Sequence, residues 1–465
     1  MGYFCLPFAL FMPTITLPYS EAGYFSAIIL DYLQQRPELN SFYGRFPSLE
    51  GLSDQLADRE AQYDPAIRKA LATELENQYK GLEFSDITRA NLKALKESNT
   101  FTITTGHQLN LFSGPLYFLY KIFSVINLCE RLKEEHPAKN FVPVFWMASE
   151  DHDFEEINYF NLHGKKFKWE HEAGGAVGDL DTQGLDRVAK LLESELGKST
   201  NGKYLSDLFV NAYTKHNDLS AATRYLANEL FSAYGLVIVD GNSAALKKWM
   251  IPYFKKELLE QPTHKTVGHT SGQLEELGYK RQVNPREINL FYLGQGNRVR
   301  IVEHEEGFGL SDGQQQWSKE QLLNQLDEYP ERFSPNALLR PLYQEVILPN
   351  LCYIGGGGEL AYWLQLRSCF ESFQVPFPVV MLRNSALLAT EKQWKKFESF
   401  DIPIASFFSG REQLINDYTH QHSEIKIDFE PQRAHLVEQF KALHQLATQT
   451  DRSFEGLWQP KRKSN

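Results

Sequence analysis

The most constraining feature of this sequence is Phe141–Met147, a stretch in which every residue is apolar. So short and complete an apolar run is typical of a strand buried on both faces, as in a parallel sheet. A second strand is predicted at Phe101–Thr105, which is rich in β-branched residues. Between the two, Pro115 is well placed in the first turn of a helix that runs to about Glu135. Strand, loop, helix and strand in this order predict a right-handed βαβ unit.

The same alternation continues along the chain. Further strands are predicted at Leu236–Asp240, Leu351–Ile354 and Phe377–Leu382, and a hairpin is predicted at Leu290–Leu293 and Val299–Val302. His264 and His269 fall among Gly, Pro and Thr and are predicted to lie in a solvated loop. The pattern as a whole predicts an α/β fold with a mostly parallel sheet and β/α insertions at about residues 160–200 and 260–330.

Beyond Ser385 the sequence becomes helical and charged. Between Pro431 and Thr450, apolar residues recur close to a heptad spacing, although over too short a stretch to establish a coiled coil by itself. These residues are Leu436, Phe440, Leu443 and Leu446. The predicted organisation is a core at residues 1–384 followed by a helical arm at residues 385–465.

The composition excludes several classes of function. The 48 Lys+Arg against 59 Asp+Glu give a net charge of −11, and without a dense basic block this argues against nucleic-acid binding. The 4 cysteines show no C-x-x-C spacing and fit a reducing cytoplasm. No apolar run reaches the roughly 20 residues that span a bilayer. The apolar first residues lack the basic start of a secretory signal, because the first Lys or Arg is Arg36.

The first motif that carries chemistry follows the strand at Phe101–Thr105. It brings together Gly106, His107, Gln108, Asn110 and Gly114, just before the predicted helix. Ligands of open α/β sheets bind where strands end, and a helix N-terminus favours phosphate. His107 and Gln108 offer donors to phosphate oxygens, while glycine lets the backbone approach closely. The plainer alternative is a tight structural turn with a capping histidine.

The second motif, Glu150–Glu156, directly follows the apolar strand at Phe141–Met147. Its Asp151, His152 and Asp153 are suited to holding Mg²⁺, binding a substrate amine or serving as acid and base. An acid-rich helix start is the plainer alternative, but it explains the later glutamates better than these three residues. The spacing matches no standard zinc-ligand pattern, and no residue is assigned to a resident metal.

The third motif is Ser334–Tyr343. If this segment is helical up to Arg340, Asn336 and Arg340 share one face. The planar, permanently charged guanidinium of Arg340 is suited to clamp a phosphate or a carboxylate. A surface arginine before a proline explains the pattern equally well.

The fourth motif is the run of four glycines at residues 355–358, which includes Gly356 and Gly357. Such a run is costly in conformational entropy unless the backbone must approach a ligand. Glu359 near the start of the next helix is placed to orient a ribose hydroxyl or an amine, and Arg383 at the end of the last strand is a weaker companion. A tight turn with an acid that favours the helix dipole is the alternative. Neither a P-loop nor a G-x-S-x-G motif occurs.

Together these motifs resemble the bacillithiol biosynthesis cysteine-adding enzyme family, BshC, from about Gly23 to about Phe454. The matching segments are TGHQLNLFSGPLYFLYK, VPVFWMASEDHDFEEI, FSPNALLRPLYQ and YIGGGGELAYW. The resemblance implies a Rossmann-like nucleotide-binding core related to class I aminoacyl-tRNA synthetases and pantothenate synthetase, with a C-terminal coiled-coil arm that forms homodimers. It also implies a ligase that makes the amide bond between L-cysteine and glucosaminyl-malate, the last step of bacillithiol biosynthesis.

The resemblance further implies that ATP, with Mg²⁺, is held by the loop containing His107. A second histidine usual in that loop is missing, so that Gln108 or Asn110 takes its place. His107, Gln108, the helix start near Gly114 and Arg340 would then meet charge on the α-phosphate. Asp151, His152 or Asp153 would bind the cysteine ammonium or deprotonate the attacking amine.

The sequence departs from the family pattern at both ends. The pattern stops after about Phe454, and Gly456–Asn465 does not resemble the arm helix, so an incomplete arm is predicted. Residues 1–19 also differ from the family start. The alternatives are a truncated, non-catalytic nucleotide-binding remnant, or a ligase of the same fold that uses another amino acid or acceptor.

Overall fold

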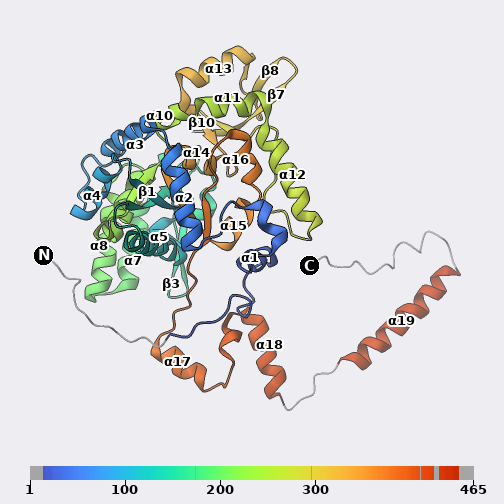
Figure 1. Cartoon of the computed structure of the whole chain (residues 1–465). Coiled ribbons are helices and arrows are strands. Elements are labelled where there is room, and N and C mark those ends of the chain that lie inside the picture. The colour runs from blue at the N-terminus through green and yellow to red at the C-terminus, as the bar shows by residue number, and fades with distance from the viewer. Residues whose placement is uncertain (1–13, 173, 295, 409, 424–428, 450–465) are drawn as a thin grey trace. The chain divides into compact units, whose positions relative to one another are not determined.

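The computed structural model describes residues 14–172, 174–294, 296–408, 410–423 and 429–449 (Figure 1). The chain divides into two compact units. One is Ser26–Leu387, and the other combines the described parts of Met1–Phe25 and Leu388–Asn465. All four motifs lie in the unit Ser26–Leu387.

The core of this unit is a five-stranded parallel sheet in the order β12-β11-β1-β2-β5. Its strands are β1 (Thr100–His107), β2 (Asn140–Met147), β5 (Val237–Asp240), β11 (Asn350–Gly355) and β12 (Val379–Leu382). All residues of β1 and β11 are buried, as expected for strands covered on both faces. The predicted α/β fold with a mostly parallel sheet is confirmed. The predicted loop at Gly106 instead continues the strand as far as His107.

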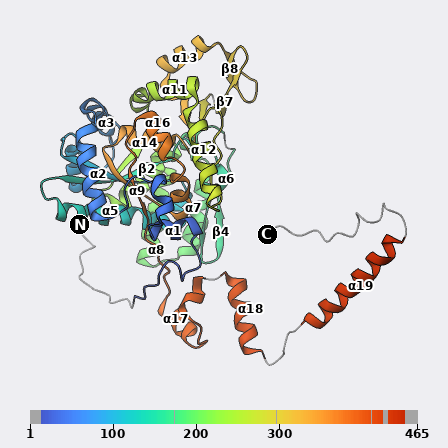
Figure 2. The same cartoon turned by 45° about the vertical axis from the view of Figure 1, so that its right-hand side comes forward.

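Helices α2 (Leu49–Gln62) and α5 (Tyr117–Glu135) cover one face of the sheet (Figures 1 and 2). Their apolar side chains join strand residues in one buried cluster, which includes Leu52, Val125, Phe101 and Cys352. The crossover helix α5 begins two residues after Pro115 and ends where predicted. Cys129, Cys352 and Cys369 are buried free thiols.

The remaining elements of this unit surround the sheet. Before β1 come α1 (Ala27–Leu33), α3 (Pro65–Gln78) and α4 (Asp86–Ala94). After β2 come α6 (Phe154–Ile157), β3 (Tyr159–Leu162), β4 (Lys165–Lys168), α7 (Leu185–Leu196), α8 (Thr200–Thr214) and α9 (Leu219–Phe231). After β5 come α10 (Ala244–Lys247), α11 (Ile251–Glu260) and α12 (Pro262–Glu276). Helices α14 (Arg340–Ile347), α15 (Gly357–Trp363) and α16 (Arg367–Phe373) flank β11.

A second, antiparallel sheet in the order β10-β6-β7-β8-β9 forms the later insertion. It contains β6 (Leu290–Leu293), β7 (Arg298–His304), β8 (Gly307–Leu310), β9 (Gln316–Trp317) and β10 (Phe333–Pro335), with α13 (Lys319–Glu328) before β10. The predicted hairpin is confirmed as β6 and β7. The loop predicted at His264 and His269 is wrong, because Pro262 starts α12 and both histidines lie on that helix.

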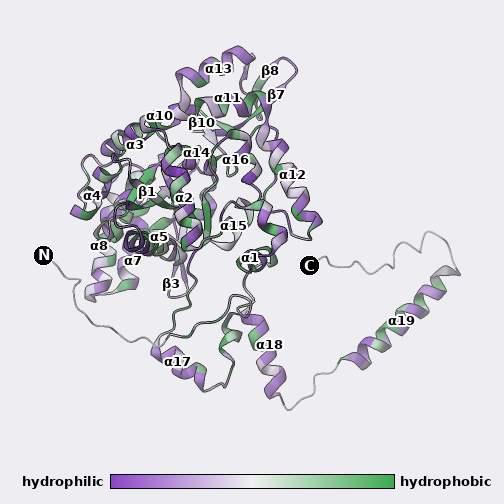
Figure 3. Ribbon diagram, viewed as in Figure 1, coloured by the Kyte–Doolittle hydropathy of each residue, from purple (hydrophilic) through white to green (hydrophobic). Residues whose placement is uncertain are grey.

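The second unit is helical in its described part, with α17 (Glu391–Glu398), α18 (Arg411–His422) and α19 (Glu430–Thr448). Along α19, hydrophobic residues alternate with hydrophilic ones (Figure 3). The departure predicted at Gly456–Asn465 lies outside the described residues. Among the described helices, none is both long and apolar enough to cross a membrane.

Candidate active site

Three of the four motifs lie at the carboxyl edge of the parallel sheet. They are called here the histidine turn (residues 106–114), the acidic stretch (residues 150–156) and the glycine run (residues 355–358). In the register of the sheet, His107 is level with Met147, and Gly355 is level with Leu382. Because all five strands are parallel, the turns that follow β1, β2 and β11 leave from the same edge. The three stretches therefore lie at one rim of the sheet.

A buried lysine joins the histidine turn to the glycine run. Lys121 on α5 has a side chain that is only 4% exposed, and its Nζ lies 2.6 Å from Oε2 of Glu359. The same Nζ donates to the carbonyl oxygen of Gly106 at 2.6 Å. The carboxylate of Glu359 also accepts from the backbone N–H of Gly356 and from the hydroxyl of Tyr353. Both oxygens of Glu359, predicted to face a ligand, are therefore held by the protein.

The charges of this pair are set by burial and by contact. Burial raises the pKa of Glu359, but Lys121 and the donors from Gly356 and Tyr353 outweigh it, so that the pKa is lowered. Burial lowers the pKa of Lys121, and Glu359 opposes that shift. The two side chains therefore form an ion pair inside the rim.

Three buried nitrogen atoms around these turns have no hydrogen-bond partner. They are Nε2 of His107, Nη2 of Arg340 and Nε of Arg383. A Cβ atom on Gly106 would lie 3.5 Å from Nη1 of Arg340, and one on Gly356 would lie 3.6 Å from Nε of Arg383. The two glycines thus leave space beside the two guanidinium groups. Buried polar atoms without partners are costly, so this arrangement favours a ligand that is rich in acceptors.

His107 is a neutral ring in this setting. Burial, and then the charge of Lys121, lower the pKa of His107 to about 3. Its ring lies against the rings of Tyr117 and Phe118, with centroids 5.6 Å and 5.1 Å away. His107 is therefore suited to hydrogen bonding and is not a cationic acid at neutral pH.

Gln108 and Asn110 connect the histidine turn to the acidic stretch. Nε2 of Gln108 donates to Asp151 at 2.9 Å and to Glu156 at 2.8 Å. Asn110 donates to the carbonyl oxygen of Glu156, and its own buried Oδ1 has no partner. Gly114 has φ of 61°, and a Cβ there would lie 2.6 Å from Cβ of Asn110. Glycine at position 114 is therefore required by the packing of this turn.

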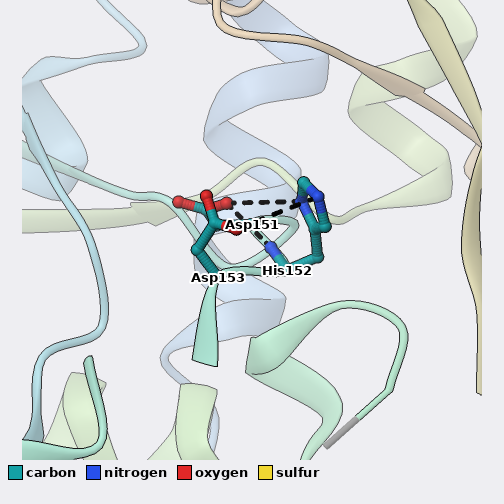
Figure 4. A group of neighbouring side chains, drawn as sticks. All are labelled: Asp151, His152 and Asp153. Carbon is teal, nitrogen blue, oxygen red and sulfur yellow. Dashed lines mark hydrogen bonds and ion pairs between the residues drawn. The ribbon is translucent and has the colours of Figure 1, made fainter. Parts of the chain in front are cut away.

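The acidic stretch carries a compact group of three side chains (Figure 4). One ligand atom from each of Asp151, His152 and Asp153 lies within 4.8 Å of the others. Arg298 of β7 donates to Nδ1 of His152 at 2.9 Å, and its guanidinium lies over the ring of Phe291. The lone pair of Nδ1 is thus engaged by a cation, which disfavours a bound metal ion there.

Asp151 is a fixed anion. Burial raises its pKa, but contact with His152, whose backbone N–H donates to Oδ1 of Asp151, and the hydrogen bond from Gln108 outweigh this effect and lower the pKa to about 2. An ionised, partly buried carboxylate at the end of β2 is suited to bind an ammonium group. Its low pKa makes Asp151 a poor acceptor of protons at neutral pH.

Asn336 does not share a helix face with Arg340, because the helix begins at Arg340, with Pro341 in its first turn. Oδ1 of Asn336 accepts from the backbone N–H groups of Leu338 and Leu339, and its Nδ2 donates to Asn289. The side chain predicted to bind a cofactor instead holds the turn before α14.

A hollow of about 420 Å³ opens at the same edge, beside β5. It is lined by Glu74, Gln78, Arg224, Asp240, Asn242, Ser243, Ala244 and Ala245. It lies two strands from His107, so this hollow is not a space shared by the three motifs.

Comparison with known proteins shows similarity to one family over most of the chain. Residues 12–384 match the family model described as Bacillithiol biosynthesis BshC, N-terminal Rossmann-like domain, and residues 386–464 match that of the BshC C-terminal coiled-coil domain. A relative from Flavobacterium johnsoniae is 52% identical over 445 residues, which cover 96% of this chain and 84% of that protein. One from Christiangramia forsetii is 53% identical over 449 residues, with the same coverage, and one from Bacillus cereus is 28% identical over 453 residues, covering 91% and 81%. All three carry the name "Putative cysteine ligase BshC".

Proposed function

This chain belongs to the BshC family, and from that premise we propose that it is an ATP-dependent ligase that joins L-cysteine to glucosaminyl-malate through an amide bond. The reaction fits the family's place in bacillithiol biosynthesis. The proposed location is the cytoplasm, which agrees with the small number of cysteines and with the buried, free thiols of Cys129, Cys352 and Cys369.

One observation carries the nucleotide part of this proposal. The unpartnered nitrogens of His107, Arg340 and Arg383 surround two turns in which glycine keeps the backbone open. Besides burial, the positive charges of Arg340 and Arg383 both lower the pKa of Lys121, and the carboxylate of Glu359 is the negative charge that opposes them. This excess of positive charge, together with the free donors of Arg340 and Arg383, suits the phosphates of ATP. The Mg²⁺ would arrive with the nucleotide.

The proposed chemistry has two steps. The carboxylate of cysteine attacks the α-phosphorus of ATP, pyrophosphate leaves, and cysteinyl-adenylate forms. The amine of glucosaminyl-malate then attacks the activated carbonyl carbon, AMP leaves, and the amine gives up one proton as the amide bond forms. Arg340 would stabilise charge on the α-phosphate in the first step, and the neutral His107 would line the same turn.

The acidic stretch would serve the amino acid. Asp151, held ionised by Gln108 and His152, would bind the α-ammonium of cysteine. Because Nδ1 of His152 accepts from Arg298, its other ring nitrogen carries the hydrogen. His152 is therefore a donor in this geometry, and the exposed Asp153 is the better candidate to take the proton from the attacking amine.

Mass spectrometry of a mixture of ATP, cysteine and glucosaminyl-malate tests this function. The expected products are the cysteine amide of glucosaminyl-malate, AMP and pyrophosphate. The amide should be absent when any one substrate is left out, and pyrophosphate should be absent when ATP or cysteine is left out. Serine in place of cysteine, and glucosamine in place of glucosaminyl-malate, are matched controls for specificity. Binding of ATP without any product would show a nucleotide-binding remnant, and a product with another amino acid would show a ligase of different specificity.

We also propose that the chain forms a homodimer through the helical arm. Apolar side chains of α19 at Leu436, Phe440 and Leu443 are about half exposed. Their spacing of four and three residues is that of a coiled-coil seam.

A further inference from the structure

A line of buried polar side chains runs beneath the rim from β1 to Arg340. Thr104 donates its hydroxyl to Oδ1 of Asn350 at 2.8 Å, and Nδ2 of Asn350 donates to Oε1 of Glu345 at 2.7 Å. The same Oε1 accepts from Nε2 of Gln344 at 2.8 Å, and Oε1 of Gln344 accepts from Nη1 of Arg340 at 3.0 Å. The first four side chains are at most 1% exposed.

Each amide in this line has only one productive orientation. Oε1 of Glu345 is an acceptor shared by two N–H groups, so Gln344 must turn its NH₂ group toward it. The carbonyl oxygen of Gln344 then necessarily faces Arg340. A flipped amide would set NH₂ against the guanidinium, where two donors meet and neither hydrogen bond forms.

This orientation leaves the Nη1 of Arg340 occupied and its Nη2 free. Nη1 is bound to Gln344, and the guanidinium is also hydrogen-bonded to Tyr362, while the buried Nη2 has no partner. Gly106, at the end of the strand that carries Thr104, lies against the same guanidinium. This line of hydrogen bonds therefore connects β1, which precedes the histidine turn, to the guanidinium of Arg340, which lies beside that turn.

We propose that Gln344 and Glu345 are positioning residues, which fix Arg340 so that its free Nη2 meets the phosphates of the nucleotide. This inference rests on the proposed ATP site. Neither residue touches the nucleotide, so both act only through Arg340.

A double-mutant cycle on the full chain, with Mg·ATP binding measured by calorimetry, tests the inference. Arg340→Met is expected to weaken binding about 100-fold, and Gln344→Met about 10-fold, because each removes a charge-assisted hydrogen bond. If Gln344 acts through Arg340, the double variant binds like Arg340→Met alone, within about 3-fold. Independent roles would instead multiply to a loss of roughly 1,000-fold, which would overturn the inference.

Gln365→Met is the matched control. Gln365 is also 1% exposed, and it accepts from the backbone N–H groups of Gln282 and Val283, away from the rim. It is expected to lower stability in urea much as Gln344→Met does, and to leave the affinity for Mg·ATP unchanged. Equal loss of affinity in both variants would mean that Gln344 only supports the fold.

Two further outcomes separate this inference from the proposed function. If the wild type binds Mg·ATP and Gln344→Met binds it with the same affinity, the positioning role alone is overturned. A wild-type chain that does not bind Mg·ATP would overturn the nucleotide site and the positioning role with it. If Gln344→Met does not fold, Thr104→Val tests the far end of the line, with an expected loss of about 3-fold in affinity.

Discussion

The ammonium of Lys121 lies 2.6 Å from the carboxylate of Glu359, and this pair joins two turns that are more than 200 residues apart in the sequence. Lys121 comes from the crossover helix, and Glu359 follows the glycine run after β11. Since Nζ of Lys121 also holds the carbonyl oxygen of Gly106, the ion pair sets the distance between the two glycine-bearing turns. Breaking a buried pair leaves one charge without a partner, which is costly.

Lys121→Met is expected to lower the free energy of unfolding by about 2–3 kcal/mol, because Glu359, whose side chain is 26% exposed, keeps its bonds to Gly356 and Tyr353 but loses its cationic partner. The double variant Lys121→Met with Glu359→Gln should recover most of that loss but not the affinity for ATP. Urea denaturation and calorimetry measure the two quantities. Lys96→Met is the control, because Lys96 and Glu76 form an exposed pair that should contribute less than about 1 kcal/mol. The interpretation fails if Lys121→Met costs no more than this control.

Asp151→Asn is expected to raise the KM for cysteine about 30-fold, since it removes the anion proposed to bind the ammonium group. The affinity for ATP should change less than about 2-fold. Because the pKa of Asp151 is lowered to about 2, its charge and the stability that it contributes are present above its ordinary value of 3.8 and are lost only as the pH falls toward 2. Cysteine binding should therefore not depend on this group near neutral pH. Glu155→Gln, an exposed neighbour in the same stretch, is the control.

The sheet could be predicted because Phe141–Met147 is apolar throughout, a pattern that burial on two faces produces, and because Phe101–Thr105 is rich in β-branched residues. Once strands at Phe101–Thr105 and Phe141–Met147 were taken as parallel, the polar residues after each had to meet at one edge. The turn at Gly106–Gly114 and the acidic stretch after β2 followed from this argument without any knowledge of tertiary contacts.

Other parts of the site depend on tertiary contacts that no local pattern reveals. Arg298 reaches His152 only because the second sheet folds back onto the rim. Asn336 was assigned to a ligand because its bonds to Asn289 and to the following backbone cannot be read from the sequence. Lys121 did leave a signal, since it is the one charged residue between Tyr117 and Cys129 on α5. A buried lysine on an apolar helix face requires a partner, and that reasoning alone would have found it.

Arg298→Met is expected to lower kcat/KM for cysteine about 10-fold, because the ring of His152 loses the donor that fixes it beside Asp151. The affinity for ATP should stay unchanged, since Arg298 does not contact the histidine turn. Arg300→Met, two residues along the same strand, removes an equal charge and is expected to have no such effect. Steady-state kinetics with cysteine as the varied substrate compares the two variants. Equal losses in both would point to general electrostatics rather than to the contact with His152.

Glu345→Gln is expected to change how stability depends on pH. Burial raises the pKa of Glu345 to about 7 from 4.5, although Arg59 and the amides of Gln344 and Asn350 oppose this shift. Between these two values the folded protein keeps a proton that the unfolded chain releases. Stability should therefore fall as the pH rises through this window, by roughly 3 kcal/mol in total.

In Glu345→Gln this contribution is absent, so its stability relative to the wild type should increase from about pH 5 to about pH 8. Urea denaturation at several pH values measures the difference. Glu371→Gln changes an exposed carboxylate and should follow the wild type. Parallel curves for all three proteins would show that Glu345 does not titrate in this window.

Helix α19 of the arm is expected to hold two copies of the chain together. On α19, Leu436, Phe440 and Leu443 share one helix face and are 52%, 49% and 49% exposed. Replacing Leu436 and Leu443 by glutamate is expected to convert a dimer to a monomer, because like charges would then face each other across the seam. Glutamate at Ala434 and Gln445 adds charge on the opposite side of the same helix and should leave the dimer intact. Sedimentation over a range of protein concentrations distinguishes the two double variants, and identical behaviour would mean that this face of α19 is not where two chains meet.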